Sequence, residues 1–182
     1  PSADTGELPL LAEAAVVVIG GGASGLTAAV EAASAGASVL IIQRDVSLGG
    51  AGLFAGNYFA AGTKWQAAAG IEDSPEAALA EWADFTGGGD PGADWVQGFV
   101  YGSAETLEWL VGFGAAFSEV TNDPGAGTVD RIHALDNSGG GGHPISALAA
   151  LVETDALLST TAVSLVDEAG TVVGVVVEDG DG

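Results

Sequence analysis

The chain has 182 residues, enough for one domain of ordinary size, and 48% of them are hydrophobic, which excludes a disordered composition. The chain has three basic and 25 acidic residues, so its formal net charge at pH 7 is −22. Because such a charge repels nucleic-acid phosphates and anionic lipid surfaces, we expect neither nucleic acid nor a membrane as a partner.

The first predicted elements form a strand–helix–strand unit. Residues 15–19 are a short apolar run rich in β-branched side chains, which indicates a strand buried on both faces of a parallel sheet. Apolar residues then recur at helical spacing, at Leu26, Ala29, Val30 and Ala33. Gly36 stands where a left-handed helix cap is expected, and a second buried strand follows at residues 38–42. Together these elements predict a βαβ unit.

Two helices are predicted in the middle of the chain. Ser74, Pro75 and Glu76 form a helix start, with serine as N-cap and glutamate near the positive end of the helix dipole. We expect a second helix to open at Asp90-Pro91 and to close at residues 112–114. Its predicted buried stripe is Trp95, Val96, Phe99, Leu107, Leu110 and Val111. The two helices predict an αα-hairpin, and we expect all four tryptophans of the chain to pack in the core.

The last third of the chain returns to a mixed pattern. Residues 122–127 are rich in turn formers, and a glycine run at 138–142 precedes a predicted helix over about residues 144–157. Residues 161–166 and 171–178 alternate apolar with small or polar side chains, as paired strands do. We expect a β-hairpin in which the four intervening residues form the connection.

These elements predict an α/β fold, a Rossmann-like domain with a parallel sheet, a helical insertion and a β-hairpin. The whole chain, residues 1–182, forms a single domain in this prediction. Residues 15–63 and 140–182 make up its nucleotide-binding core, and residues 64–139 make up the helical insertion.

Three glycines at the spacing Gly20-x-Gly22-x-x-Gly25 follow the first predicted strand and open the first predicted helix. The first glycine of such a motif allows a tight turn, the second lets the backbone approach a pyrophosphate, and the third lets the helix pack on the strand. The helix N-terminus presents N–H groups to the ligand, and Ser24 adds a hydroxyl donor. The motif predicts dinucleotide binding, with a glycine-rich structural turn as the alternative.

The residue after the second strand usually binds the ribose of the dinucleotide through a carboxylate. Gln43 occupies this position, and its amide oxygen accepts a hydrogen bond without the strength that a charge adds. Arg44 suggests instead the ribose phosphate of NADP. Asp45 supplies an acid if the strand end is shifted. The sequence leaves these alternatives open.

Further short motifs follow the glycine motif along the chain. They are Val39-Leu-Ile-Ile-Gln-Arg44, Leu48-Gly49-Gly50, Ala60-Ala-Gly-Thr63, Asp73-Ser-Pro-Glu76, Glu108-Trp-Leu110, Arg131-x-His133 and residues 165–175. In this order the chain resembles, over almost its whole length, the flavoproteins grouped with fumarate reductase, which include urocanate reductases and 3-ketosteroid dehydrogenases.

The resemblance implies FAD as the cofactor. The residues that match the family's pyrophosphate-binding turn are Gly20, Gly22, Ala23, Ser24 and Gly25, and those at the ribose position are Gln43 and Arg44. The residues that match the loop along the flavin are Gly49, Gly50, Ala55, Gly56 and Asn57. Val163 lies on the strand whose backbone meets the adenine. The chain departs from the family's pattern where Gln43 replaces an acid, Ala51-Gly52 replaces a polar pair and Asn57 replaces a glycine.

The resemblance also implies an oxidoreductase that, as an intact protein, transfers a hydride to or from an activated carbon–carbon bond of a small molecule, a dicarboxylate or an enone. The family's substrate-binding and proton-donating residues match nothing in this chain. We therefore expect no catalytic residue here and a domain that is incomplete at its C-terminus. A homo-oligomer or a missing C-terminal chain is then an expected partner.

Two other functions stay open at the level of the sequence. The pair Gln43-Arg44 favours an NAD(P)-binding dehydrogenase domain. A Rossmann-like fold that has lost its cofactor would instead be a non-catalytic binding or assembly module.

His133 and His143 are the two histidines, and no cysteine is present, which excludes disulfides and thiolate ligands. With no carboxylate pair at ligand spacing, we expect no metal site. We interpret His133 as a structural hydrogen-bonding residue, with a supporting role near the flavin loop as the alternative. Residues 1–13 hold no positively charged leader, although a removed leader stays open. The sequence does not identify the compartment, and a cytoplasmic location is slightly favoured over an exported one.

Overall fold

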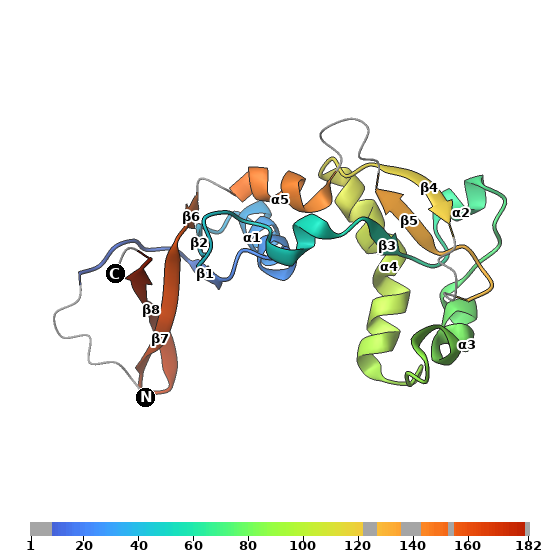
Figure 1. Cartoon of the computed structure of the whole chain (residues 1–182). Coiled ribbons are helices and arrows are strands. Elements are labelled where there is room, and N and C mark those ends of the chain that lie inside the picture. Colours follow the sequence, from blue (N-terminus) through green and yellow to red (C-terminus); the bar gives the residue numbers. More distant parts are fainter. Residues whose placement is uncertain (1–8, 122–126, 136–142, 153–154, 181–182) are drawn as a thin grey trace. The chain divides into compact units, whose positions relative to one another are not determined.

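The computed structural model describes residues 9–121, 127–135, 143–152 and 155–180 (Figure 1). The predicted glycine run at 138–142 lies outside these ranges, as does the predicted turn-rich connection apart from Gly127.

The chain divides into two compact units. The first unit is Pro1–Phe54 with Leu148–Gly182, and the second unit is Ala55–Ala147. The assignment of the nucleotide-binding core and of the insertion to particular residues stays a prediction.

A three-stranded parallel sheet and one helix form the centre of the first unit. The strands are β1 (Val16–Ile19), β2 (Val39–Ile42) and β6 (Ala156–Leu157), in the order β1-β2-β6. α1 (Ala23–Ser34) connects β1 to β2. The predicted βαβ unit is therefore confirmed, and Gly36 has the left-handed backbone (φ +86°) predicted for the end of the helix.

β6 corrects the predicted helix over residues 144–157. α5 (Pro144–Val152) ends early, and residues 156–157 instead pair in parallel with the end of β2. The pairing continues in a hydrogen bond from the Gln43 N–H to the Leu157 carbonyl (2.9 Å). Alanine and leucine favour a helix locally, but here they satisfy the edge of β2 that faces away from β1, so tertiary pairing overrides the local preference.

The predicted β-hairpin is confirmed as β7 (Thr160–Glu168) paired antiparallel with β8 (Thr171–Asp179). Its connection is two residues long instead of the predicted four. Ala169 and Gly170 both have positive φ, at +53° and +87°, as in a type I′ turn, whose twist matches that of paired strands. The strands therefore pair right up to the turn.

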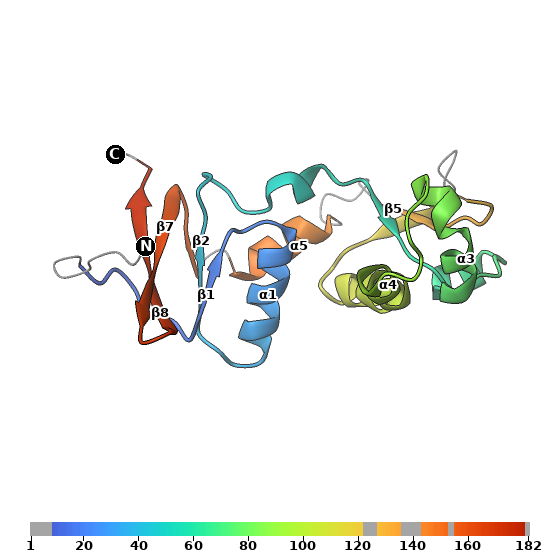
Figure 2. The same cartoon turned by 90° about the horizontal axis from the view of Figure 1, so that it is seen from below.

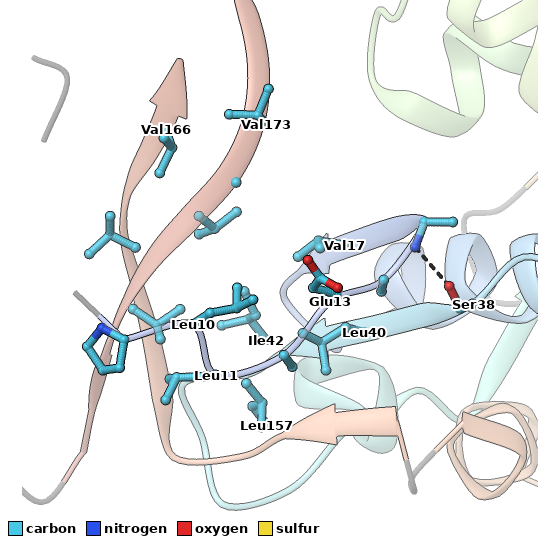
Figure 3. A pocket seen from close by; sticks show the side chains of 18 residues that line it. Leu10, Leu11, Glu13, Val17, Ser38, Leu40, Ile42, Leu157, Val166 and Val173 are labelled. Carbon is cyan, nitrogen blue, oxygen red and sulfur yellow. Dashed lines mark hydrogen bonds between the residues drawn. The ribbon is translucent and has the colours of Figure 1, made fainter. Parts of the chain in front are cut away.

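The two faces of the parallel sheet have different neighbours, α1 on one side and the hairpin on the other (Figure 2). The buried residues of α1 are Leu26, Ala29 and Val30. The opposite face lines a cavity of about 780 Å³ together with the N-terminal segment and the hairpin (Figure 3). The sheet residues at this cavity include Val17, Leu40 and Ile42.

The exposure of β1 corrects the prediction that this strand is buried on both faces. Val17 is 38% exposed and Ile19 is 54% exposed, whereas the alternate residues of the strand are less accessible. The alternation shows that α1 covers one face of β1 closely and that the face toward the cavity is open.

Among its described residues, the second unit contains three complete helices, the start of α5, and an antiparallel sheet that the sequence did not lead us to predict. The helices are α2 (Lys64–Ala68), α3 (Pro75–Thr86) and α4 (Asp94–Gly112). The strands are β3 (Asn57–Phe59), β5 (Ile132–Leu135) and β4 (Phe117–Thr121), in the order β3-β5-β4. No helix in the described ranges of the chain is long and apolar enough to cross a membrane.

α3 begins as predicted, whereas α4 begins later than predicted. The Ser74 hydroxyl accepts a hydrogen bond from the Ala77 N–H (3.2 Å), and Gly87 ends α3 in the left-handed region (φ +70°). The Asp90 carboxylate accepts from the Gly92 N–H (2.8 Å). This contact forms a turn before α4 instead of the predicted helix start.

The core of the second unit lies where α3 and α4 meet, with Ala61, Ala78, Trp82, Val96 and Val100 as its buried members. The predicted stripe of α4 is wrong at Trp95 and Phe99, which are 69% and 42% exposed. The buried residues of α4 are Val96, Val100, Ser103, Leu107 and Leu110, at alternating spacings of four and three residues. Trp95 and Phe99 stand beside this stripe, with ring centroids 6.1 and 6.0 Å from that of Trp82.

Ala169→Gly should stabilise the first unit, because glycine adopts φ +53° without the clash that an alanine Cβ makes there. We expect the free energy of unfolding to rise by about 0.5–1 kcal/mol, measured by denaturant titration. The matched control is Ala28→Gly at an exposed position of α1, where glycine should lower the same quantity by a similar amount. Destabilisation by both substitutions would contradict the assigned turn.

Candidate functional site

The three-glycine motif lies between β1 and α1, at the carboxyl end of the parallel sheet. Gly20 has φ +96°, and its N–H donates to the Ile42 carbonyl (2.8 Å), which ties the turn to the end of β2. Gly22 is the N-cap of α1 and provides no side chain to cap the helix. The helix N-terminus is therefore available to a ligand, as the motif predicts.

The glycines of the motif have distinct steric roles. A Cβ atom at Gly25 would lie 1.8 Å from the Gly20 carbonyl oxygen, so no larger residue fits between helix and strand. A Cβ atom at Gly22 would meet no atom within 4 Å, so it would project into open space in front of the loop. Bare backbone at Gly22 is not required by internal packing, and it fits the close approach of a pyrophosphate. Ala23 and Ser24 are exposed beside it.

A second glycine pair packs against the motif. The Gly49 N–H donates to the Gly21 carbonyl (2.7 Å), and Gly49 forms a parallel bridge with Gly22. Gly50 begins a short 3₁₀ helix, η1 (Gly50–Phe54), and a Cβ atom on Gly50 would lie 3.8 Å from the Gly22 Cα. The structure thus brings the predicted pyrophosphate turn and the predicted Gly49-Gly50 loop together.

Gln43 lies directly after β2, as predicted, but its amide is already used within the protein. The residue is 6% exposed. Its Oε1 accepts from the Gly21 N–H (2.9 Å), and its Nε2 donates to Asp45 Oδ2 (3.2 Å) and to the Ser47 carbonyl (3.3 Å). The Arg44 side chain is 79% exposed, with Nε 3.8 Å from Asp45 Oδ1. Gln43 therefore fastens the glycine turn to the end of β2.

Residues 15–182 match the family model described as the FAD binding domain. The chain belongs to this family. A fumarate reductase (cytochrome) of Shewanella frigidimarina is 34% identical over 173 residues, which cover 90% of this chain and 29% of that protein.

Solved structures agree with the family assignment. A flavocytochrome c3 fumarate reductase in its open conformation matches with a TM-score of 0.76 and 30% identity, over 89% of this chain and 29% of that one. A 3-ketosteroid-Δ4-(5α)-dehydrogenase of Rhodococcus jostii RHA1 matches with a TM-score of 0.76 and 30% identity, over 98% of this chain and 44% of that one. The chain spans less than a third of the length of the curated relatives it matches.

These findings confirm the predicted fold, the resemblance to fumarate reductase and 3-ketosteroid dehydrogenase flavoproteins, and FAD as the cofactor. The match to a urocanate reductase of Eggerthella lenta confirms the third group of the predicted resemblance. The chain is an FAD-binding domain of fumarate reductase-like flavoenzymes. The glycine turn, open in front of Gly22 and uncapped at α1, fits the pyrophosphate of FAD.

The remaining predicted FAD contacts lie outside the glycine loops. Val163 is in β7 where the register with β8 shifts between Ala162 and Ser164, so it has no opposite residue of its own. Ala55, Gly56 and Asn57 belong to the second unit and are exposed. The roles of these four residues toward adenine and flavin stay predictions.

Sequence reasoning missed the contribution of the turn between β6 and β7. The Ser159 N–H donates to the Asp45 carbonyl (3.0 Å), and the Thr160 N–H donates to the Gln43 carbonyl (2.9 Å). These residues fix the backbone of the segment that follows β2. More than a hundred positions separate them from Gln43, and no local pattern signals such a contact.

His133 is fully buried and hydrogen-bonded on both ring nitrogens, in agreement with a structural role. Its Nδ1 donates to the Arg131 carbonyl (3.2 Å), which leaves Nε2 to accept from the Thr63 hydroxyl (2.9 Å). Burial lowers the pKa of His133, so the ring is neutral at pH 7. No cluster of three metal-ligating side chains occurs among the residues that the structure describes.

A buried ion-pair network lies next to His133. The Arg131 guanidinium donates to both carboxylate oxygens of Asp73, at 2.8 and 2.9 Å, and to Glu81 Oε2 at 2.7 Å. The side chains of Arg131 and Asp73 are 3% and 0% exposed. The Gln66 amide also donates to Asp73 Oδ2 (2.8 Å). Because these groups satisfy one another, the network joins α2, α3 and the residue before β5 instead of offering a reactive group.

Glu81→Gln should remove a pH-dependent part of the stability. Hydrogen bonds from Thr128 and Arg131 lower the pKa of Glu81 from 4.5 to about 2, so its contribution is present above pH 4.5 and is lost as the pH falls toward 2. We expect the variant to be less stable by about 1–3 kcal/mol at pH 7 in thermal or denaturant unfolding, with the difference shrinking below pH 4.5. Glu105→Gln, at an exposed position of α4, is the control. A difference that is independent of pH would contradict the assigned network.

Gly22→Ala and Gly25→Ala should separate ligand binding from folding. Alanine at Gly22 meets no protein atom, so we expect unchanged stability of the protein without FAD but an FAD affinity that is lower by at least tenfold, measured by quenching of flavin fluorescence. Alanine at Gly25 clashes with the Gly20 carbonyl and should lower the melting temperature before any ligand is added. If the Gly22 variant bound FAD with unchanged affinity, the assignment of the pyrophosphate to this loop would be wrong.

Proposed function

We propose that the intact protein that contains this chain is a flavin-dependent oxidoreductase that transfers a hydride between FAD and an activated carbon–carbon bond. The supporting observation is the similarity to fumarate reductase along 90% of the chain, together with a glycine turn that is open where a pyrophosphate would lie. The proposed substrate is a small molecule of the dicarboxylate or enone class. Both classes are supported, because the matching proteins include a fumarate reductase and a ketosteroid dehydrogenase bound to 4-androstene-3,17-dione.

The proposed contribution of this chain is to bind and orient the cofactor. When bound, FAD supplies the hydride chemistry. The N–H groups at the start of α1 attract the diphosphate, and Gly22 leaves it room. We assign no catalytic residue within the described ranges, because the buried ionisable side chains His133, Asp73 and Arg131 are all engaged with protein groups.

Reoxidation of the reduced flavin tests the proposal and chooses between the substrate classes. The intact protein, reduced by dithionite without oxygen, is mixed with fumarate or with 4-androstene-3,17-dione, and the flavin absorbance is followed. Two electrons leave the flavin and the alkene gains a hydride and a proton. We expect one of the two to restore the oxidised spectrum rapidly, with succinate and buffer as controls.

The cofactor is identified in the same preparation by mass spectrometry of the released nucleotide. We expect FAD and no NADP. Reoxidation by neither alkene would contradict the proposed reaction while leaving the FAD site intact. Release of a nicotinamide dinucleotide without flavin would contradict both.

A further inference from the structure

Gln43 occupies the position of the ribose-binding acid but is a poor acceptor for ribose. The two hydroxyl groups of a ribose need acceptors, and the amide has only one acceptor atom, Oε1. This oxygen already accepts from the Gly21 N–H (2.9 Å), it carries no charge, and the residue is 6% exposed. Its Nε2 donates to two other protein groups. The Gln43 amide thus uses its hydrogen bonds to stabilise the loop.

Asp45 has the properties that Gln43 lacks. Its carboxylate is charged, 59% exposed, and held beside the glycine loop through Gln43 Nε2 (3.2 Å). A carboxylate offers about four lone-pair sites, of which Gln43 uses one. Arg44 Nε lies 3.8 Å from the other oxygen, beyond hydrogen-bond range, so this pair leaves acceptor capacity free.

The backbone around Asp45 is fixed from a second side. The Asp45 carbonyl accepts from the Ser159 N–H (3.0 Å), and the Gln43 carbonyl accepts from the Thr160 N–H (2.9 Å). The residue is therefore anchored by its main chain to the β6–β7 turn and by its side chain to Gln43. An acceptor that is held in place before binding gives more affinity than one that must be ordered by the ligand.

We propose that Asp45 binds the ribose hydroxyl groups of the adenosine half of FAD and that Gln43 is a positioning residue, which holds the Asp45 carboxylate beside the glycine loop. The proposal rests on the FAD site and does not depend on the substrate. The proposal also argues against a ribose phosphate bound by Arg44, because a carboxylate at this point repels the additional phosphate of NADP.

The test compares two nucleotides and two proteins. Binding of ADP and of 2′,3′-dideoxy-ADP to the FAD-free intact protein is measured by calorimetry. We expect the natural protein to prefer ADP by about tenfold or more, and Asp45→Asn to lose most of that preference by binding ADP more weakly. Simple charge repulsion predicts the opposite sign, since removing a negative charge beside a diphosphate should strengthen ADP binding.

Glu168→Gln is the matched control, because it removes one negative charge from the same unit at an exposed position of β7. It should leave the preference for ADP unchanged. Melting temperatures of all variants without nucleotide show whether folding is intact, and exposure of Asp45 makes a folding defect in that variant unexpected.

Gln43→Leu tests the positioning role. If Gln43 only stabilises the loop, this variant weakens both nucleotides equally and keeps the ratio of their affinities. If Gln43 holds Asp45 in place, the ratio falls toward one, as it does in Asp45→Asn.

Three outcomes would overturn the proposal. They are an unchanged preference for ADP in Asp45→Asn, tighter ADP binding by that variant, and no preference in the natural protein. Binding of neither nucleotide nor FAD by the natural protein would overturn the FAD site as well, which distinguishes the two failures.

Discussion

The close contact between the first turn of α1 and the end of β1 is the constraint on which the site depends. Because a Cβ atom at Gly25 would lie 1.8 Å from the Gly20 carbonyl oxygen, helix and strand meet in this geometry only with glycine there. The contact fixes where the helix N-terminus points. The Gly49 loop and the Gln43 amide then bind the same turn through Gly21, from its carbonyl and its N–H respectively. The glycine turn is thus part of both the packing of the sheet and the cofactor site.

The features predicted correctly from the sequence are those decided within a short stretch of chain. The glycine spacing, the apolar face of α1 and the cap at Ser74 each reflect contacts between residues a few positions apart. The structure has all three, except that Ala33 of the predicted face is exposed. The position of Gln43 after β2 was also predictable, because it follows from where a parallel strand ends. What its amide binds was not, since Gly21 lies 22 positions away.

The features that were missed depend on partners distant in sequence or on small shifts of helical phase. Residues 156–157 have helix-favouring side chains but become a strand because β2 has a free edge. The sheet of the second unit joins three segments, of which β5 contains His133 among apolar residues and shows too few positions for a period to be recognised. Trp95 directly precedes the buried Val96 in the sequence. The sequence pattern alone does not distinguish an apolar side chain at the border of a buried helix face from one inside that face.

The charge of the chain determines how a dianionic diphosphate can be bound. The sequence has only three basic residues, and each lies within 4 Å of a carboxylate: Arg44 of Asp45, Lys64 of Glu108, and Arg131 of Asp73 and Glu81. The positive potential at the glycine turn therefore comes from backbone N–H groups and the helix dipole. Unlike basic side chains, these groups do not form ion pairs with the acidic side chains of the surface. Backbone groups attract any diphosphate alike. Discrimination between cofactors must come from side chains at the ribose, where the chain places the carboxylate of Asp45.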